Sequence, residues 1–163
     1  MPGTYRIDPA GSAVTFRTRH LFGVGAVRGR FQVRHGEIRI MNPARASAAS
    51  AVISAASFHT GNPQRDATVQ SARLLDAAAH PDITFTSTRL EEAGGRWLLH
   101  GQLTVRGSTR PVSVRVDEAR SDGSSLSARA SLRVDRYRFG ITRARGLAAR
   151  YLDCRLDITA SQA

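Results

Sequence analysis

Alternation of apolar and polar residues along almost the whole chain is the feature that most limits its fold. In residues 12–20, Val14 and Phe16 share one parity while Arg17 takes the other, and residues 28–40 repeat the pattern. Successive side chains of a β-strand point to opposite faces, so each such segment predicts a strand with one dry and one wet face. The alternation returns in 49–55, 83–86, 97–105, 112–116, 126–134 and 151–158.

Turn signals separate these segments, and apart from one interruption no helical pattern stands between them. They are Asp8-Pro9, His35-Gly36, Asn42-Pro43, Gly94-Gly95, Arg106-Gly107 and Asp122-Gly123. Strands with short connections favour an antiparallel meander. Closing about eight strands into a lipocalin-like barrel removes the exposed edges and leaves room for one small ligand. The sequence therefore predicts an all-β, extended antiparallel barrel, with a β-sandwich as the alternative.

Residues 62–79 interrupt the alternation. Asn62 is a capping residue and Pro63 follows it at the position where helices begin, so one or two short helices are predicted near residues 63–79. Leu74 and Leu75 are apolar in an otherwise isolated insertion. They should pack against the barrel, with the helix acting as a plug or lid across its mouth.

Size and charge narrow the class of protein further. The chain has 163 residues, enough for a single domain (1–163), and no apolar run reaches the roughly 18 residues of a membrane span. No signal peptide is visible, so a cytoplasmic location is expected. The formal net charge is +11, all from scattered Arg residues without any Lys, which predicts solvated outer strand faces. A nucleic-acid-binding module is the alternative that this charge suggests.

No residue pattern specifies catalysis or a metal site. The five histidines form no ligand motif, no Gly-x-Ser-x-Gly elbow exists, and Cys154 shares parity with Leu152, as expected of a packed thiol. An enzyme acting on a barrel-bound lipid remains a third hypothesis. His20 ends its segment with inward parity, so it either binds a ligand's polar head or hydrogen-bonds to loop backbone. Arg65 either takes an anion at the helix start or pairs with Asp66.

Several short motifs, in order, carry a family resemblance. They are Tyr5 to Phe16 with His20 after it, Val27 to Phe31, Ser57 to Thr60 with Asn62 and Arg65-Asp66, Leu74 to Asp76, His80 to Ser87, Gly101 to Gly107, and Arg136 to Ile141. The set resembles the YceI-like family of polyisoprenoid-binding proteins. Two departures fall in the interrupted region 62–79, where Thr68-Val69 replaces the family's His-Leu and Leu74-Leu75 replaces its aromatic pair.

The resemblance implies a barrel whose tunnel holds a polyprenyl chain or an isoprenoid quinone, for storage or transport, with no enzymatic reaction and no required cofactor. Transient contact with an anionic membrane surface fits the charge, nucleic acid is not expected, and a homodimer stays open. The candidate ligand-binding residues are Val14, Phe16, His20, Phe31, Ile38, Ile40, Ile53, Arg65, Leu74, Leu75, Phe85, Leu99, Leu103, Val114, Phe139 and Ile141. Parity places the apolar members inside, whether that inside is filled or hollow.

Overall fold

The computed structural model describes residues 2–18, 25–144 and 149–163. Its strands are β1 (Gly3–Ile7), β2 (Ala13–Arg17), β3 (Arg28–Ile40), β4 (Ala48–His59), β5 (Asp82–Ala93), β6 (Arg96–Val105), β7 (Ser108–Ser121), β8 (Ser125–Asp135) and β9 (Tyr151–Gln162). One α-helix, α1 (Pro63–Gln70), and two 3-10 turns, η1 (Ala44–Ala46) and η2 (Arg136–Phe139), complete the described elements.

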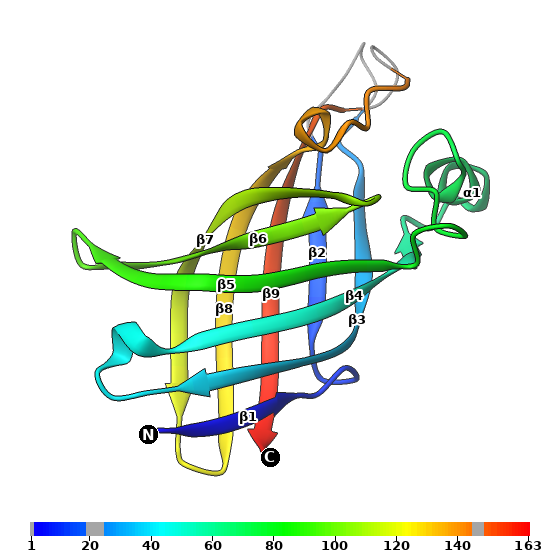
Figure 1. Cartoon of the computed structure of the whole chain (residues 1–163). Coiled ribbons are helices and arrows are strands. Elements are labelled where there is room, and N and C mark those ends of the chain that lie inside the picture. The colour runs from blue at the N-terminus through cyan, green and yellow to red at the C-terminus, as the bar shows by residue number, and fades with distance from the viewer. Residues whose placement is uncertain (1, 19–24, 145–148) are drawn as a thin grey trace.

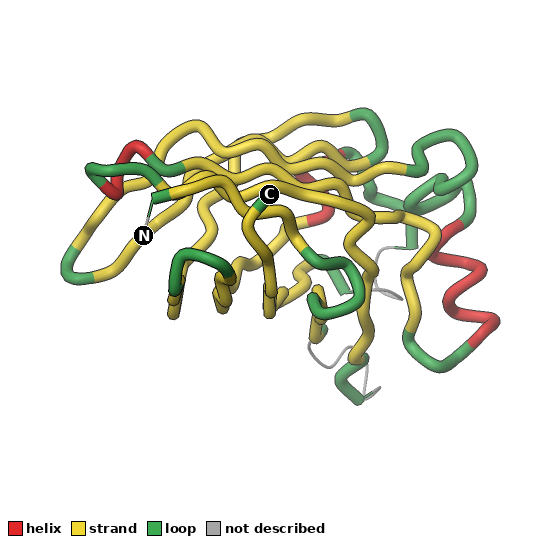
Figure 2. The backbone as a smooth tube through the Cα atoms, turned by 90° about the horizontal axis from the view of Figure 1, so that it is seen from below, coloured by secondary structure: helices red, strands yellow, loops and turns green. Residues whose placement is uncertain are grey.

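The strands form one sheet that closes on itself (Figures 1 and 2). The order is β1-β3-β2-β9-β8-β7-β6-β5-β4, and β3 also pairs with β4, which joins the two ends. Every described pairing is antiparallel, and β1 and β2 both lie between β3 and β9, so the two short strands fill one position. The result is the predicted eight-position antiparallel barrel, and the closure rules out the β-sandwich.

Register explains why alternation in the sequence becomes an apolar interior. Val14 lies opposite Phe31 on β3 and Leu156 on β9, and Leu156 lies opposite Ala130 on β8. Cross-strand partners share a face of the sheet, so between register shifts one parity of each strand points inward. Every parity assignment on these four strands therefore agrees with the sequence prediction.

One irregularity brings in a residue that parity assigns to the outside. Arg30 lies opposite His59, whereas Gln32 lies opposite Ser54, so β4 uses more residues than β3 over this stretch. Extra residues in one strand shift the faces of those that follow. Phe58 consequently turns into the barrel and is buried, although Ile53 has the opposite parity on the same strand.

The interrupted region forms one α-helix, which agrees with the prediction of one or two. Asn62 Oδ1 accepts from the Arg65 backbone N–H at 3.0 Å, and Pro63 occupies the first turn, as predicted. Residues 71–80 then form successive turns, in which the Leu75 N–H donates to the Val69 carbonyl at 2.8 Å. In α1 only Asp66 is buried, and Figure 1 shows the helix standing at the side of the barrel. The plug is therefore the turn segment 71–80, called the lid segment below, and not a helix.

Candidate functional site

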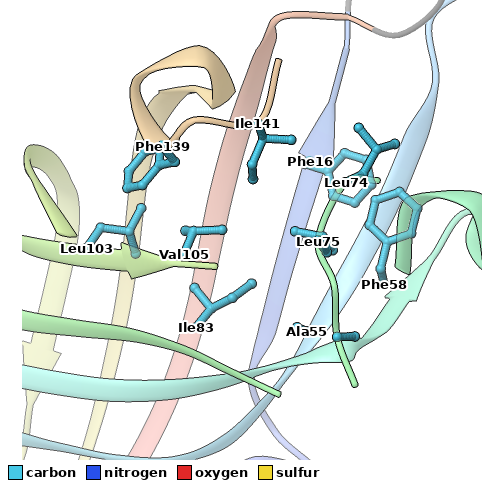
Figure 3. Close-up of a cluster of buried hydrophobic side chains, with 11 residues drawn as sticks. Phe16, Ala55, Phe58, Leu74, Leu75, Ile83, Leu103, Val105, Phe139 and Ile141 are labelled. Carbon is cyan, nitrogen blue, oxygen red and sulfur yellow. The ribbon is translucent and has the colours of Figure 1, made fainter. Parts of the chain in front are cut away.

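The lid segment fills one end of the barrel with apolar side chains (Figure 3). Leu74 and Leu75 are 6% and 9% exposed, and they pack with Phe16 and Phe58, whose rings stack at 5.1 Å. This lid cluster comprises Phe16, Ala55, Phe58, Leu74, Leu75, Ala77, Ile83, Leu103, Val105, Phe139 and Ile141. The prediction that the two leucines pack against the barrel is confirmed.

Asp66 fastens α1 to the end of β4. Its Oδ1 accepts from the Thr60 hydroxyl at 2.6 Å and from the Thr60 N–H at 3.0 Å. These hydrogen bonds, led by the hydroxyl, lower the pKa of Asp66 below its ordinary value because they favour the charged form. Arg65 donates to the Thr60 hydroxyl at 3.3 Å instead of pairing with Asp66. The predicted Arg65–Asp66 ion pair is thus not formed, and the Arg65 guanidinium contacts Thr60 at the junction of β4 and α1.

Two further arginines hold the chain over the barrel end. Arg106, in the β6–β7 turn, donates to the Leu74 carbonyl at 2.7 Å. Arg136 is buried and donates to the carbonyls of Ile141 and Arg143 at 2.8 and 2.7 Å. Charged donors make strong hydrogen bonds to buried carbonyls. The Arg-x-x-Phe-Gly motif thus has a structural account, because Arg136 fixes the segment that inserts Phe139 and Ile141.

A second inner surface has the same composition but a different environment. Leu90 lies opposite Leu99, Trp97 opposite Val116, and Val116 opposite Ala130, so the set is continuous across four strands. This surface, called the β5–β8 wall, comprises Leu90, Trp97, Leu99, Val116, Ala130 and Leu132. All six are half-buried although they face inward, and none belongs to any of the three clusters of packed apolar residues. The wall side chains are therefore less tightly packed than those of the three clusters.

The total surface area agrees with an unfilled interior. The accessible surface is 9393 Å² for a mass of 17.6 kDa. A compact monomer of that mass exposes about 7,900 Å², roughly 1,500 Å² less. An inner face that water still reaches is one source of such an excess, and the half-buried wall residues are part of that face.

The structure divides the predicted binding residues unevenly. Phe16, Leu74, Leu75, Leu103, Phe139 and Ile141 are buried in the lid cluster, with Phe31, Ile53 and Phe85 packed against it. Ile38 and Ile40 pack around Tyr5 at the other end, and Val14 packs with Ile7 and Val33. Leu99 belongs to the wall, and Val114 is buried opposite Leu99 on β7. Arg65 lies outside the barrel, and His20 lies outside the described residues.

The candidate residues named from the sequence do not include most of the wall. Trp97, Val116, Ala130 and Leu132 had the correct inward parity, but parity carries no information on whether a partner fills the space opposite. Leu90 could not have been placed, since a register shift between Ser87 and Arg89 changes its face.

Two inward-facing glycines allow aromatic rings to lie close to the backbone. A Cβ at Gly101 would lie 2.6 Å from the Phe85 ring, and a Cβ at Gly29 would collide with the Phe16 ring. Glycine at these positions lets an aromatic ring lie flat on the neighbouring strand. The close approach of these rings is a physical reason for glycine at both positions.

An outer-face chain of hydrogen bonds bears on the enzyme hypothesis. His100 Nδ1 lies 2.7 Å from Ser113 Oγ, and its Nε2 lies 3.0 Å from Glu91 Oε1. A hollow of about 350 Å³ lies beside it, lined by Thr88, Arg89, His100, Gly101, Gln102, Pro111, Val112, Ser113 and Arg138. Acyl transfer needs free N–H donors for an oxyanion, yet the strand of His100 is paired on both sides, to β5 and to β7. Glu91, His100 and Ser113 therefore form a polar contact between neighbouring strands.

Cys154 and the potential metal-ligating side chains bear on the same enzyme hypothesis. Burial raises the pKa of the Cys154 thiol to about 12, and the side chain packs against the lid cluster, as predicted for a core cysteine. Across the ranges 2–18, 25–144 and 149–163, no three His, Cys, Asp or Glu side chains gather where they could hold a metal ion. The most distinctive feature of the described structure is thus its apolar interior.

A closed antiparallel barrel with an apolar, partly unfilled interior and a fastened lid segment defines the lipocalin-like class. Residues 5–161 match the family model described as YceI-like domain, and the chain belongs to that family. Protein YceI of Escherichia coli O157:H7 is 35% identical over 114 residues, covering 68% of this chain and 59% of that protein. A UPF0312 protein of Vibrio cholerae is 31% identical over 118 residues, covering 69% and 61%. The alignments thus span about three fifths of these relatives.

Solved structures share the fold. BcnA of Burkholderia cenocepacia superposes with a TM-score of 0.84 at 23% identity, covering 95% of this chain and 99% of that one. A polyisoprenoid-binding domain from Saccharophagus degradans superposes with a TM-score of 0.74 at 15% identity, covering 100% of both chains. Among the described residues of the present chain, no helix has the length and apolar character needed to cross a membrane.

Proposed function

We propose that this protein binds a long isoprenoid lipid, a polyprenyl chain or the tail of an isoprenoid quinone, along the β5–β8 wall inside the barrel. The observation that carries the proposal is the continuous set of inward, half-buried apolar side chains that contact none of the packed clusters. Membership of the YceI-like family and the fold shared with a polyisoprenoid-binding domain support the same ligand class.

The energetics favour a long apolar ligand over a small polar one. Each buried CH2 group contributes about 0.8 kcal/mol, so one five-carbon isoprene unit contributes about 3 to 4 kcal/mol before ordering costs. The wall offers leucine, valine, tryptophan and alanine surface and no charged partner for a head group. Affinity would therefore grow with chain length, and the head group would contribute less than the tail.

Binding, with storage or transport as its purpose, needs no chemical step at the wall. The hydroxyl, imidazole and carboxylate that lie together, Ser113, His100 and Glu91, are on the outer face of the sheet. A bound chain would reach solvent through movement of the lid segment, which hydrogen bonds from Arg106 and the packing of Leu74 hold in place.

The single tryptophan provides a direct test, because Trp97 belongs to the wall. Delipidated protein titrated with a polyprenol should show a saturable blue shift of Trp97 emission as lipid displaces water from the indole. A quinone bearing the same tail should bind with similar affinity, and Trp97→Phe should abolish the signal while extracted lipid still co-purifies. An unchanged spectrum together with lipid-free purified protein would contradict the proposal.

A further inference from the structure

A group of arginines lies on the outer face of the barrel beside the lid end. Arg17 on β2 lies directly opposite Arg28 on β3, and Arg30 follows two residues later on the same face. All three are exposed, and none forms an ion pair with any carboxylate in the described part of the chain. Like charges directly opposite each other on neighbouring strands destabilise a sheet. The pairing of Arg17 with Arg28 is therefore unfavourable for the sheet.

The neighbouring strands show the arrangement that stability does favour. On β7 to β9, Arg115 pairs with Asp117, Arg129 with Asp157 and Arg133 with Asp153, at 2.9, 3.3 and 2.8 Å. Asp153 also lies opposite Arg17 in the register, but its carboxylate accepts from Arg133. The three arginines of β2 and β3 thus keep their charge available next to strands on which arginines and aspartates form ion pairs.

An exposed aromatic residue adjoins them. Tyr151, at the start of β9, is 40% exposed, and the guanidinium groups of Arg150 and Arg133 lie 5.0 and 5.6 Å from its ring centre. It precedes Asp153 by two residues on the same face, which places it diagonal to Arg17. Tyrosine has an apolar body and a polar tip, and together with arginine it suits the boundary between lipid head groups and acyl chains.

The position of this surface connects it to the barrel interior. Phe16, the neighbour of Arg17, points inward into the lid cluster, and Leu152, the neighbour of Tyr151, packs against the same cluster. Figure 1 shows the upper ends of β2, β3 and β9 beside each other near η2. A lipid leaving or entering beneath the lid segment would therefore do so next to these side chains.

We propose that Arg17, Arg28, Arg30 and Tyr151, the arginine face, dock on an anionic lipid bilayer and bring the lid end to the membrane. The proposal rests on the proposed function, since an isoprenoid must be taken from or returned to a bilayer. Arginine forks bind phosphate oxygens bidentately, and basic side chains are drawn to anionic membrane surfaces. The exposed ring of Tyr151 beside the arginines favours a bilayer over a nucleic acid, because tyrosine suits the boundary between head groups and acyl chains.

Vesicle binding by the intact protein tests the proposal with a matched pair of variants. Arg28→Ser/Arg30→Ser removes two charges from the arginine face. Arg45→Ser/Arg96→Ser removes two exposed charges, neither in a described ion pair, from the β3–β4 connection and from the start of β6, which lie on the left of Figure 1. Each basic residue near an anionic surface is worth about fivefold in binding, so the first pair should weaken co-sedimentation by more than about tenfold. The second pair should leave binding within about twofold of wild type.

The lipid compositions and competitors set the outcomes that overturn the proposal. Phosphatidylglycerol-containing vesicles should bind at low salt, and vesicles of phosphatidylcholine alone should not. Equal losses in both variant pairs would show a net-charge effect and overturn the docking face. Competition by a random oligonucleotide at lower concentration than the vesicles would identify a nucleic-acid surface instead. Lipid extracts distinguish the two proposals, because failed vesicle binding with isoprenoid still present in the protein contradicts only the docking.

Discussion

The lid cluster and the β5–β8 wall are built from the same kinds of residue on the same inward parity, yet they have opposite environments. Leu75 in the lid cluster is 9% exposed and contacts the side chains of other elements, whereas Leu99 on the wall is half-buried and belongs to no cluster. The difference arises from the opposing side. A chain segment inserts opposite the first, and no described segment inserts opposite the second. The interior of a barrel is therefore open to a ligand only where no segment of the same chain packs into it.

This contrast separates the tightly packed part of the interior from the part where we propose that lipid binds. Rings of Phe16, Phe31 and Phe58 lie 5.1 to 5.7 Å apart at the lid end and contribute packing energy to the apo protein. The wall contributes less to the apo protein because its side chains lack partner atoms on one side. A ligand occupying that space would add the missing contacts.

The largest effect is expected for truncation within the lid cluster. Phe16 is 4% exposed and contacts two other rings, so Phe16→Ala should lower the free energy of unfolding by about 3 to 5 kcal/mol. Urea denaturation measures this change directly. A loss below about 1 kcal/mol would mean that the lid end is not tightly packed.

A matched pair of leucine truncations tests whether the wall is less tightly packed than the lid cluster. Leu75→Ala should cost about 2 to 4 kcal/mol, because it leaves a cavity in a packed cluster. Leu99→Ala in delipidated protein should cost only about 1 kcal/mol, since the space beside it is already open. Equal costs for the two variants would show that the wall is packed as tightly as the lid cluster.

The smallest effect concerns acid stability at a site remote from both regions. In the β7–β8 turn, N–H groups of Ser125 and Ser124 donate to Asp122 and lower its pKa from 3.8 to about 2. A carboxyl with a depressed folded pKa stabilises the fold above its unfolded value, and the stabilisation is lost as the pH falls through the folded value. Asp122→Asn should therefore be less stable than wild type above about pH 4. The difference should disappear near pH 2, where the folded pKa of Asp122 lies. A constant difference in denaturation midpoint across that range would contradict this assignment.

The strands, the closure and the capped helix were predictable because each rests on local signals. Alternation fixed the inward face of Trp97 and Leu99, and Asn62-Pro63 fixed the start of α1. Features that depend on another part of the chain were not predictable. The shifted face of Phe58 follows from its register against β3, and the need for Gly101 follows from a ring on β5.

The candidate site was predictable only as a category. The inward apolar set was right in parity, but most of the chosen residues, such as Phe139 and Ile141, belong to the packed lid cluster or pack against it. Whether an inward side chain packs against another segment of the protein depends on where the segment between β4 and β5 lies. The helix signal at Pro63 gave no information on that point, because the packing comes from the turns that follow it.

The proposed binding of lipid along the wall is tested most directly by the lipid content of two variants that each add a phenylalanine ring to β8. Ala130→Phe adds a ring to the wall, and Ser127→Phe adds the same ring to the exposed outer face of the same strand. The unfolding free energies of both should stay within about 1.5 kcal/mol of wild type, since neither ring meets tightly packed atoms. Organic extracts analysed by mass spectrometry should contain isoprenoid lipid for wild type and Ser127→Phe, and much less per mole of protein for Ala130→Phe. Equal isoprenoid in all three, or a collapse of stability for Ala130→Phe, would contradict the hollow wall.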